Sequence, residues 1–379
     1  MSMKIGLMGF EFKSANKGCE ALAYAFLSIL EDISSNNEIA IYNFTGTELG
    51  EIPEHFRMFE FHNVTPKLKD IKCTYIRAVR NCDYIFDVTM GDSFSDIYSK
   101  DYYDYLIRNK EIVSFINNRY ILLPQTYGPF EYEDSIHSAK KVLKRSYRIY
   151  CRDKLSQSLL ENKFNIHNSI LSPDMAFVLQ YDKNMYHFSH RDKLGLNVSG
   201  LLYKGGFNKD NQFGLTVNYR ELVEQLICSL SKKYEVHLIP HVIDLAENAY
   251  DDDYKICMKL HTMYPNTYLS PAFTTPIQAK SYISNMDIFI GSRMHSTIGA
   301  FSSGVLTIPI SYSRKFEGLF GSLNYPYTID ARTESTESAY DKVYAFIEKK
   351  QELIQSQEKA LELIEHNIYE FKNSLKELF

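Results

Sequence analysis

The sequence alternates short apolar runs with segments of helical spacing, and this alternation restricts the fold more than any other feature. In the first half, apolar runs occur at residues 4–9, 39–44, 84–89, 119–123 and 148–151. Segments with an apolar residue every three or four positions lie near residues 21–33, 102–115 and 136–144. Strands that alternate with helices form a mostly parallel sheet with helices on both faces. We therefore expect an α/β fold of the doubly wound type.

A second alternating series begins after a polar stretch at residues 180–192. Strands are expected at 193–198, 235–239, 287–290 and 306–310, with helices near 219–232, near 253–261 and from about Ser296. This predicts two Rossmann-like domains, residues 1–185 and 186–335, that face a cleft lined by the carboxyl ends of the strands, where ligands bind. Helical spacing from Ser338 onward predicts a helical tail, residues 336–379, that packs on the domains.

Charge and composition exclude several classes of protein. Lys and Arg number 42 against 47 Asp and Glu, a net charge of -5, so no basic field is present to hold nucleic acid. No apolar run reaches the ~18 residues of a membrane span, and the N-terminus does not resemble a signal peptide. The six cysteines are scattered without metal-ligand spacing, which favours free thiols and no metal site. We expect a cytoplasmic protein.

In the first half, the segments that directly follow strands carry polar side chains. The loop at residues 9–22 enters a helix and brings Lys13 or Lys17 to its free amides, which suits a phosphate or a sugar hydroxyl; a plain strand-to-helix connection fits equally well. At residues 87–96 three carboxylates could act as a base or hold a metal, or could cap a helix. Residues 124–130 form a rigid turn that could present Gln125, Thr126 and Tyr127.

The second half contains the strongest signal. After the strand at 287–290, Arg293 and His295 precede a helix that begins at about Ser296, and a guanidinium, an imidazole and a helix N-terminus together suit a carboxylate or a phosphate. His241 follows the strand at 235–239, although a lone histidine is more often structural. Lys315 adds a cation after the strand at 306–310. We expect a small anion to bind here.

Eight short motifs in order resemble those of the polysaccharide pyruvyl transferase family. They are Asn16-x-Gly18-x-Glu20-Ala21-Leu22, Gly91-Asp92-Ser93, Pro124-Gln125-Thr126-Tyr127-Gly128-Pro129-Phe130, Arg152-Asp153-x-x-Ser156, Pro173-Asp174-Met175-Ala176-Phe177, Ile239-Pro240-His241-Val242, Arg293-Met294-His295 and Tyr312-x-x-Lys315. The resemblance implies a GT-B-like fold. It also implies transfer of pyruvate from phosphoenolpyruvate to a sugar of a cell-surface polysaccharide or exopolysaccharide precursor, with formation of a ketal and release of phosphate, and no cofactor.

The resemblance also implies roles for individual residues, with the acceptor on the first domain and the donor on the second. Arg293 and His295 correspond to the element that contacts phosphoenolpyruvate. His295 is the expected general acid or donor-phosphate ligand, with His241 in support and Asp92 or Asp96 as a base. The remaining expected contacts are Met294, Ser296 and Lys315 for the donor, and Asn16, Glu20, Gln125 and Tyr127 for the acceptor.

Two departures concern the acceptor side. Met90-Gly91-Asp92-Ser93 stands where family members commonly have a glycine run, and Cys19 stands where an acidic residue is frequent. An unusual acceptor is therefore expected. The sequence does not indicate which sugar it contains or how the pyruvate is linked, nor does it indicate if the acceptor is carried by a lipid, a nucleotide or a polymer.

Two other functions are compatible with the sequence. One is a GT-B glycosyltransferase that uses a nucleotide sugar, since a cationic pocket would also serve a diphosphate. The other is a catalytically silent saccharide-binding member, suggested by the altered glycine run. The tail carries more acidic than basic side chains, a poor match for an anionic membrane surface. Peripheral membrane contact and a homo-oligomer are both left open.

Overall fold

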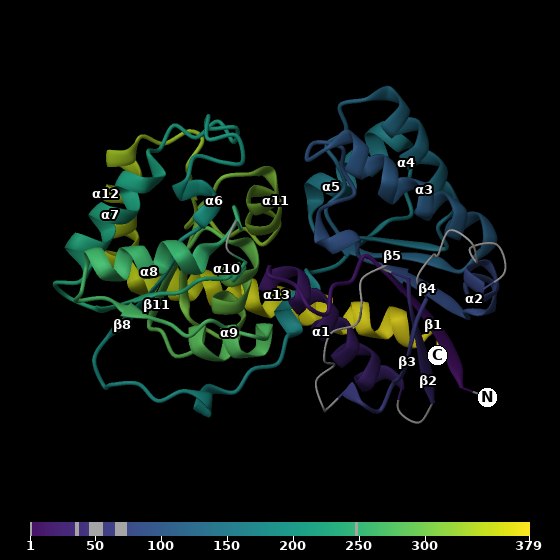
Figure 1. Cartoon of the computed structure of the whole chain (residues 1–379), viewed down its shortest axis with the longest axis horizontal. Coiled ribbons are helices and arrows are strands. Elements are labelled where there is room, and N and C mark those ends of the chain that lie inside the picture. The colour runs from purple at the N-terminus through teal and green to yellow at the C-terminus, as the bar shows by residue number, and fades with distance from the viewer. Residues whose placement is uncertain (1, 35–37, 45–55, 65–73, 247–248) are drawn as a thin grey trace. The chain divides into compact units, whose positions relative to one another are not determined.

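The computed structural model describes residues 2–34, 38–44, 56–64, 74–246 and 249–379, which form two compact units (Figure 1). Unit 1 comprises Met1–Lys13, Leu22–Met175 and Asn367–Phe379. Unit 2 comprises Ser14–Ala21 and Ala176–His366. Among the described residues, no helix combines the length and apolar character that crossing a bilayer would require.

The sheet of unit 1 has seven parallel strands in the order β3-β2-β1-β4-β5-β6-β7. Their bounds are β1 (Met3–Met8), β2 (Ile39–Asn43), β3 (Glu60–Asn63), β4 (Tyr84–Asp87), β5 (Tyr120–Gln125), β6 (Arg148–Cys151) and β7 (Ile170–Leu171). The helices are α1 (Lys17–Ser34), α2 (Ile76–Asn81), η3 (Thr89–Gly91), α3 (Lys100–Ile116), α4 (Glu133–Arg145) and α5 (Lys154–Phe164). The strand order reverses direction between β1 and β4, so the carboxyl ends of these two neighbours are the expected place for a ligand.

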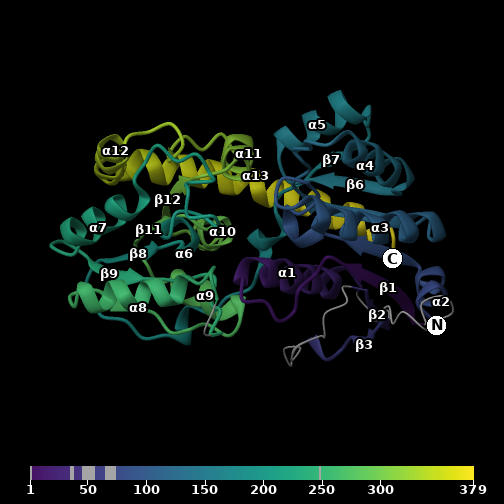
Figure 2. The same cartoon turned by 45° about the horizontal axis from the view of Figure 1, so that its top comes forward.

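The sheet of unit 2 has six parallel strands in the order β10-β9-β8-β11-β12-β13, with helices on both of its sides (Figure 2). The strands are β8 (Lys193–Asn197), β9 (Glu235–Leu238), β10 (Tyr268–Leu269), β11 (Ile288–Gly291), β12 (Leu306–Ser311) and β13 (Ile329–Asp330). The helices are η4 (Met175–Val178), η5 (Lys183–Met185), α6 (Gly200–Tyr203), α7 (Tyr219–Leu230), α8 (Asp253–Met263), α9 (Pro276–Ile283), α10 (Met294–Ser302), α11 (Arg314–Ser322), α12 (Thr336–Glu348) and α13 (Lys350–Lys376). Here the order reverses between β8 and β11.

The architecture confirms the predicted fold class, since every predicted strand has a counterpart in one of two parallel sheets. The edge strands β3, β7, β10 and β13 were not predicted. β7, β10 and β13 have two residues each, too few to give a hydrophobic period, and β3 (Glu60–Asn63) lacks an apolar run because three of its four residues are polar.

The division of the chain differs from the boundary expected at residue 185. The segment that follows Met175 joins unit 2 because α9 holds it: Lys280 Nζ donates to the Leu179 carbonyl at 2.7 Å, and the Ser281 hydroxyl accepts from the Asp182 amide at 2.9 Å. The C-terminal tail also divides, because the chain of α13 passes from unit 2 to unit 1 after His366.

Each part of α13 packs on its own unit. In unit 2 Gln357 donates to the Val305 carbonyl at 2.8 Å and accepts from the Thr307 amide at 3.2 Å. In unit 1 the ring of Phe371 packs edge-on against Tyr150, with 4.9 Å between ring centroids. The apolar face predicted for the tail is therefore buried against both units.

Three of the recognised motifs meet in one buried polar network of unit 1. Arg152 Nη1 donates to Asp174 Oδ2 at 2.7 Å, and Arg152 Nε donates to Thr126 Oγ1 at 2.9 Å. Thr126 in turn donates to Asp153, which also caps α5 by accepting from the Ser156 amide at 2.7 Å. These motif residues hold loops together inside the unit.

We expect Asp174→Asn to lower the free energy of unfolding by about 3–5 kcal/mol, because it leaves Arg152 charged and unpaired in the interior. Both side chains of the pair are at most 1% exposed. The matched control is Asp32→Asn, which removes the exposed pair with Lys372 in the same unit and should cost less than about 1 kcal/mol. Urea unfolding of both variants measures the difference; equal losses would contradict a structural role for the buried pair.

Candidate functional site

The candidate site of unit 2 lies where the chain leaves β8, β9 and β11. Asn197, the last residue of β8, fixes the turn after β11: its Oδ1 accepts from the Ser292 and Arg293 amides at 3.2 and 2.8 Å and from the Ser296 hydroxyl at 2.9 Å. Arg293 is consequently held at the N-terminal boundary of α10. Arg293 is therefore the residue that precedes the first turn of α10, which begins at Met294.

Two carboxylates surround the guanidinium of Arg293. Asp253, fully buried, accepts from Arg293 Nε at 3.2 Å and from Nη2 at 2.7 Å. Asp251, whose side chain is 28% exposed, accepts from Arg293 Nη1 at 3.3 Å and also pairs with Nη2. Burial alone would lower the pKa of Arg293, but Asp253 and Asp251 raise it well above its usual value. Arg293 is therefore a permanent cation whose outer edge is covered by an accessible carboxylate.

Asp253 also binds the backbone of two neighbouring loops. Its Oδ1 accepts from the Gly200 amide at 2.7 Å, and its Oδ2 accepts from the amides of His241 and Val242 at 3.1 and 2.9 Å. The loops after β8, β9 and β11 thus converge on this one carboxylate. His241 and Arg293, which are 52 positions apart in the sequence, share it as a partner.

His241 has a buried imidazole that is available to a ligand. The residue is 4% exposed, and neither ring nitrogen has a hydrogen-bond partner among the residues that the structure describes. Burial, with the nearby charges of His295, Arg293 and Lys17, lowers the pKa of His241 well below its usual value. The ring is therefore neutral at pH 7 and can accept one hydrogen bond and donate another.

The start of α1 packs directly on His295. A Cβ atom added to Gly18 would lie 2.3 Å from His295 Nδ1, so only glycine allows this approach. The segment is fastened to the loop after β9 by two backbone bonds, from the Lys17 amide to the His241 carbonyl at 3.0 Å and from the Ile243 amide to the Ala15 carbonyl at 2.8 Å. This pairing explains why residues 14–21 belong to unit 2.

Asn16 and Glu20, the predicted acceptor contacts near the N-terminus, accordingly lie in unit 2 beside the predicted donor residues. Asn16 caps α1 by accepting from the Gly18 amide at 3.0 Å. Lys17 donates to Glu20 at 2.8 Å, to the Ser14 carbonyl at 2.7 Å and to the Thr274 carbonyl at 3.0 Å. The three donors of the Lys17 ammonium group are therefore occupied, and the group holds α1 in place.

The other predicted donor contacts occupy the first turns of two helices. Met294 is buried at the start of α10, and the Ser296 hydroxyl is within hydrogen-bonding distance of Asn197 and of the Arg293 carbonyl, at 2.9 and 2.8 Å. Lys315, on α11, places Nζ 5.7 Å from the ring centroid of Tyr312. Ser296 therefore helps to fix the turn, and Lys315 lies beside Tyr312.

The predicted residues of unit 1 have different surroundings. Gln125 is fully buried and donates to the Asp87 carbonyl at 3.0 Å. Tyr127 is also fully buried, with its hydroxyl donating to the Tyr150 carbonyl at 3.0 Å. Asp92 is half-buried and accepts from the Tyr98 hydroxyl at 2.8 Å, whereas Asp96 binds the amides of residues 131 and 132. Gln125 and Tyr127 therefore pack inside unit 1, and their predicted contact with a sugar stays a prediction.

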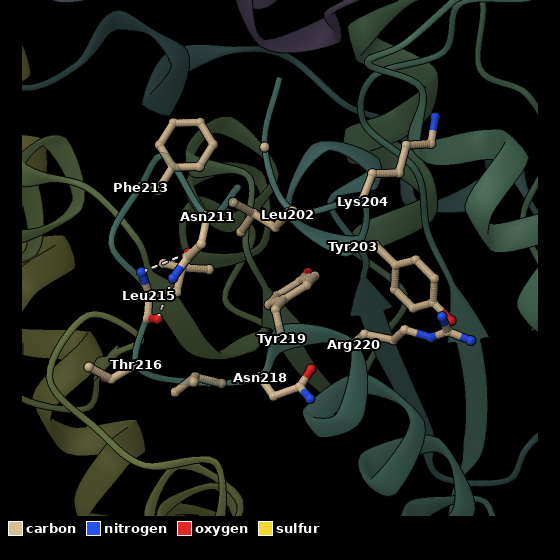
Figure 3. A pocket seen from close by; sticks show the side chains of 13 residues that line it. Leu202, Tyr203, Lys204, Asn211, Phe213, Leu215, Thr216, Asn218, Tyr219 and Arg220 are labelled. Atoms are coloured by element: carbon tan, nitrogen blue, oxygen red, sulfur yellow. Dashed lines mark hydrogen bonds between the residues drawn. The ribbon is translucent and has the colours of Figure 1, made fainter. Parts of the chain in front are cut away.

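A hollow of about 470 Å³ adjoins this turn in unit 2, and Figure 3 shows the side chains around it. Tyr219, at the centre of the view, donates its hydroxyl to Ser292 at 2.8 Å, the residue before Arg293. Phe213, on the opposite wall, packs edge-on against Tyr312 with 5.3 Å between centroids. Neither this hollow nor the roles of Asp251 and Asp253 were predicted from the sequence. An acidic run before a helix is usually a cap, so only the long-range contact with Arg293 reveals their role.

Comparison with known proteins gives a family and a fold. The family model described as polysaccharide pyruvyl transferase matches residues 16–314. A search of curated protein sequences found no match.

Three solved structures illustrate the likeness in fold. A putative UDP-N-acetylglucosamine 2-epimerase from Listeria monocytogenes has a TM-score of 0.62 and 11% identity over 96% of this chain and 91% of its own. The UDP-GlcNAc 2-epimerase from Neisseria meningitidis bound to UDP-GlcNAc has a TM-score of 0.58 and 10% identity over 97% and 100%. The glycosyltransferase SnogD from Streptomyces nogalater has a TM-score of 0.52 and 10% identity over 100% of both. The fold is therefore of the GT-B class expected from the sequence.

We expect Gly18→Ala to destabilise the protein by about 1–3 kcal/mol, the usual cost of overpacking, because the new methyl group must displace His295 or the start of α1. The imidazole resonances of His295 should also move. Gly321→Ala is the matched control, since a Cβ there meets nothing within 4 Å. Urea unfolding and histidine side-chain NMR measure both effects, and a Gly18→Ala variant with unchanged His295 resonances would contradict the close contact.

We expect Asp251→Asn to strengthen binding of inorganic phosphate about fivefold, because Asp251 occupies the edge of Arg293 that an anion would use. An interaction of ~1 kcal/mol corresponds to about a fivefold change in a dissociation constant. Asp341→Asn removes the same charge from the exposed face of α12 and should leave the affinity unchanged. Calorimetric titration tests this, and weaker binding by Asp251→Asn would show that Asp251 does not compete with the anion.

Proposed function

Because the chain belongs to the polysaccharide pyruvyl transferase family, we propose that it transfers pyruvate from phosphoenolpyruvate to two hydroxyls of a sugar, forming a ketal and releasing phosphate. One observation carries this proposal: Arg293, His241 and His295 converge in unit 2 around a single turn and helix start. Phosphoenolpyruvate is a small anion with a carboxylate and a phosphate, and this group of donors suits both.

The donor would replace Asp251 at the outer edge of Arg293. A guanidinium binds planar oxygen pairs in a bidentate manner, so a carboxylate or phosphate can take the two positions that Asp251 occupies. Asp253 stays in place on the opposite edge and keeps the guanidinium oriented. Lys315 supplies a second cation for the other anionic group.

The reaction requires two proton transfers that balance. The two sugar hydroxyls release one proton each. One proton is added to the methylene carbon of phosphoenolpyruvate, which becomes the methyl group of the ketal. The neighbouring carbon of phosphoenolpyruvate, C2, forms bonds to the two sugar oxygens. The C2–O bond to phosphate breaks, and the phosphate leaves with the second proton. His295 is the proposed acid at the methylene carbon, because histidine is the side chain that most often serves as a general acid.

His241 and Asp92 have the remaining roles in the proposed reaction. His241 stays neutral and offers its unpartnered ring nitrogens to the donor as hydrogen-bonding groups. Asp92 is the proposed base that takes a proton from a sugar hydroxyl. The acceptor belongs to a polysaccharide or to its precursor.

Thermal unfolding with phosphoenolpyruvate tests the donor without knowledge of the acceptor. A ligand at about 100 times its dissociation constant adds ~2.7 kcal/mol to the stability of the native state. We expect a shift for the unmodified protein, and a smaller shift for Arg293→Lys, which retains the charge but loses the bidentate geometry. Lys315→Gln should also reduce the shift, whereas Lys232→Gln, at an exposed site, should not.

The same thermal unfolding experiment with a panel of nucleotide sugars tests the alternative function. A shift with a nucleotide sugar and none with phosphoenolpyruvate would contradict the proposal and indicate a GT-B glycosyltransferase. No shift with either ligand, in the presence or absence of sugar, would favour a saccharide-binding member without activity.

A further inference from the structure

Unit 1 contains a cavity of about 250 Å³ at the carboxyl ends of β1 and β4. These strands are neighbours in the sheet (Figure 1), and the strand order reverses between them. In open parallel sheets, ligands bind at this reversal, beyond the carboxyl ends of the strands. The cavity is therefore where the topology of unit 1 leads us to expect a ligand, and none of the residues predicted as acceptor contacts lines it.

One wall of the cavity is a rigid loop. Thr89 and Met90 have φ angles of 44° and 52°, in the left-handed region that costs a residue with a side chain about 1–3 kcal/mol. Asp87 holds this conformation, since its Oδ1 accepts from the Thr89 amide and from the Thr89 hydroxyl, both at 2.8 Å. The Met90 amide donates to the Gly9 carbonyl at 2.8 Å. The wall is thus fixed before any ligand arrives.

The polar groups of the cavity do not favour an anion. Lys110, which lines it, is 3% exposed and pairs with the buried carboxylate of Asp87. Lys110 also donates to Thr89 Oγ1 at 2.8 Å, and Tyr120 donates to Asp87. The ammonium charge is therefore neutralised by its own partner, and Glu11 adds a carboxylate to the lining. A neutral ligand fits these charges better than a phosphate or a carboxylate.

Another part of the lining comes from α3, which contributes aromatic rings. Tyr102, Tyr105 and Asn109 are three and four positions apart, the spacing that aligns side chains on one face of a helix. Tyr102 and Tyr105 are 41% and 57% exposed. A tyrosine offers a flat apolar ring with a polar tip, a surface that matches the C–H face and the hydroxyls of a pyranose. Asn109 and Glu11 can bond to further hydroxyls.

We infer that this cavity binds the sugar of the acceptor, as a neutral pyranose lying against Tyr105. The inference rests on the proposed function, in which a sugar supplies the attacking hydroxyls. The volume supports one sugar ring: 250 Å³ holds about eight water molecules at ~30 Å³ each. It is smaller than the ~300–1,000 Å³ typical of pockets for drug-sized ligands.

Saturation-transfer NMR with a panel of methyl glycosides tests this site, with and without phosphoenolpyruvate. The panel contains the methyl glycosides of glucose, galactose, mannose and their N-acetylamino derivatives. We expect at least one glycoside to receive saturation from the protein, and the signal to fall at least fivefold in Tyr105→Ala. Tyr105→Phe keeps the ring and should retain the signal. Tyr369→Ala removes a tyrosine that is 63% exposed on α13 and is the matched control.

Three results would overturn the inference. The first is no transfer to any glycoside of the panel, and the second is transfer that persists in Tyr105→Ala. The third is transfer to the alkyl chain of octyl glucoside without transfer to methyl glucoside, which would assign the cavity to an apolar tail. Phosphoenolpyruvate binding is measured separately through Arg293. A protein that does not bind phosphoenolpyruvate would contradict the proposed donor. Binding of a glycoside that depends on Tyr105 would still support a sugar site in the cavity.

Discussion

The arrangement of unit 2 depends on one buried carboxylate, that of Asp253. A charge removed from water is costly unless hydrogen bonds and an opposite charge compensate for it. Asp253 obtains both, from the amides of Gly200, His241 and Val242 and from the guanidinium of Arg293. These groups come from the ends of three strands that are distant in sequence. The loops are therefore held in the one geometry that satisfies the carboxylate, and the same geometry brings His241 and Arg293 together.

The buried cations of the two units differ in the exposure of their carboxylate partners. In unit 2 the second carboxylate on Arg293, that of Asp251, is partly exposed, so an incoming anion can exchange with it at little desolvation cost. In unit 1 the Lys110 ammonium group is paired with a carboxylate that is itself fully buried, and exchange would leave Asp87 unpaired in the interior. Exposure of the counter-charge thus decides whether a buried cation can bind a ligand. The exposure of Asp251 and the burial of Asp87 therefore support the proposals of anion binding in unit 2 and neutral sugar binding in unit 1.

The sequence predicted the sheets and the position of Arg293 and His295 because both depend on local pattern: an apolar run, then polar residues at the carboxyl end of a strand. It did not predict which way a side chain points. Gln125 and Tyr127 also follow a strand, but the structure places them inside unit 1. Asn16 and Glu20 were assigned to the first domain by their place in the chain, whereas pairing with residues 241–243 carries them into unit 2. Such long-range pairing leaves no local signal.

The loop after β4 contains Met90-Gly91-Asp92-Ser93, where a glycine run is common in the family, and this departure has a physical consequence. Glycine adopts the left-handed region without steric strain, so a glycine run could form the loop after β4 with no clash of side chains. In this chain Thr89 and Met90 adopt the left-handed region despite their side chains, and Asp87 holds Thr89 through two hydrogen bonds. The Met90 side chain lines the cavity beside Tyr102, whose hydroxyl lies 3.2 Å from its sulfur. A glycine at position 90 would have no side chain to line the cavity, so Met90 reduces the space that the proposed sugar could occupy.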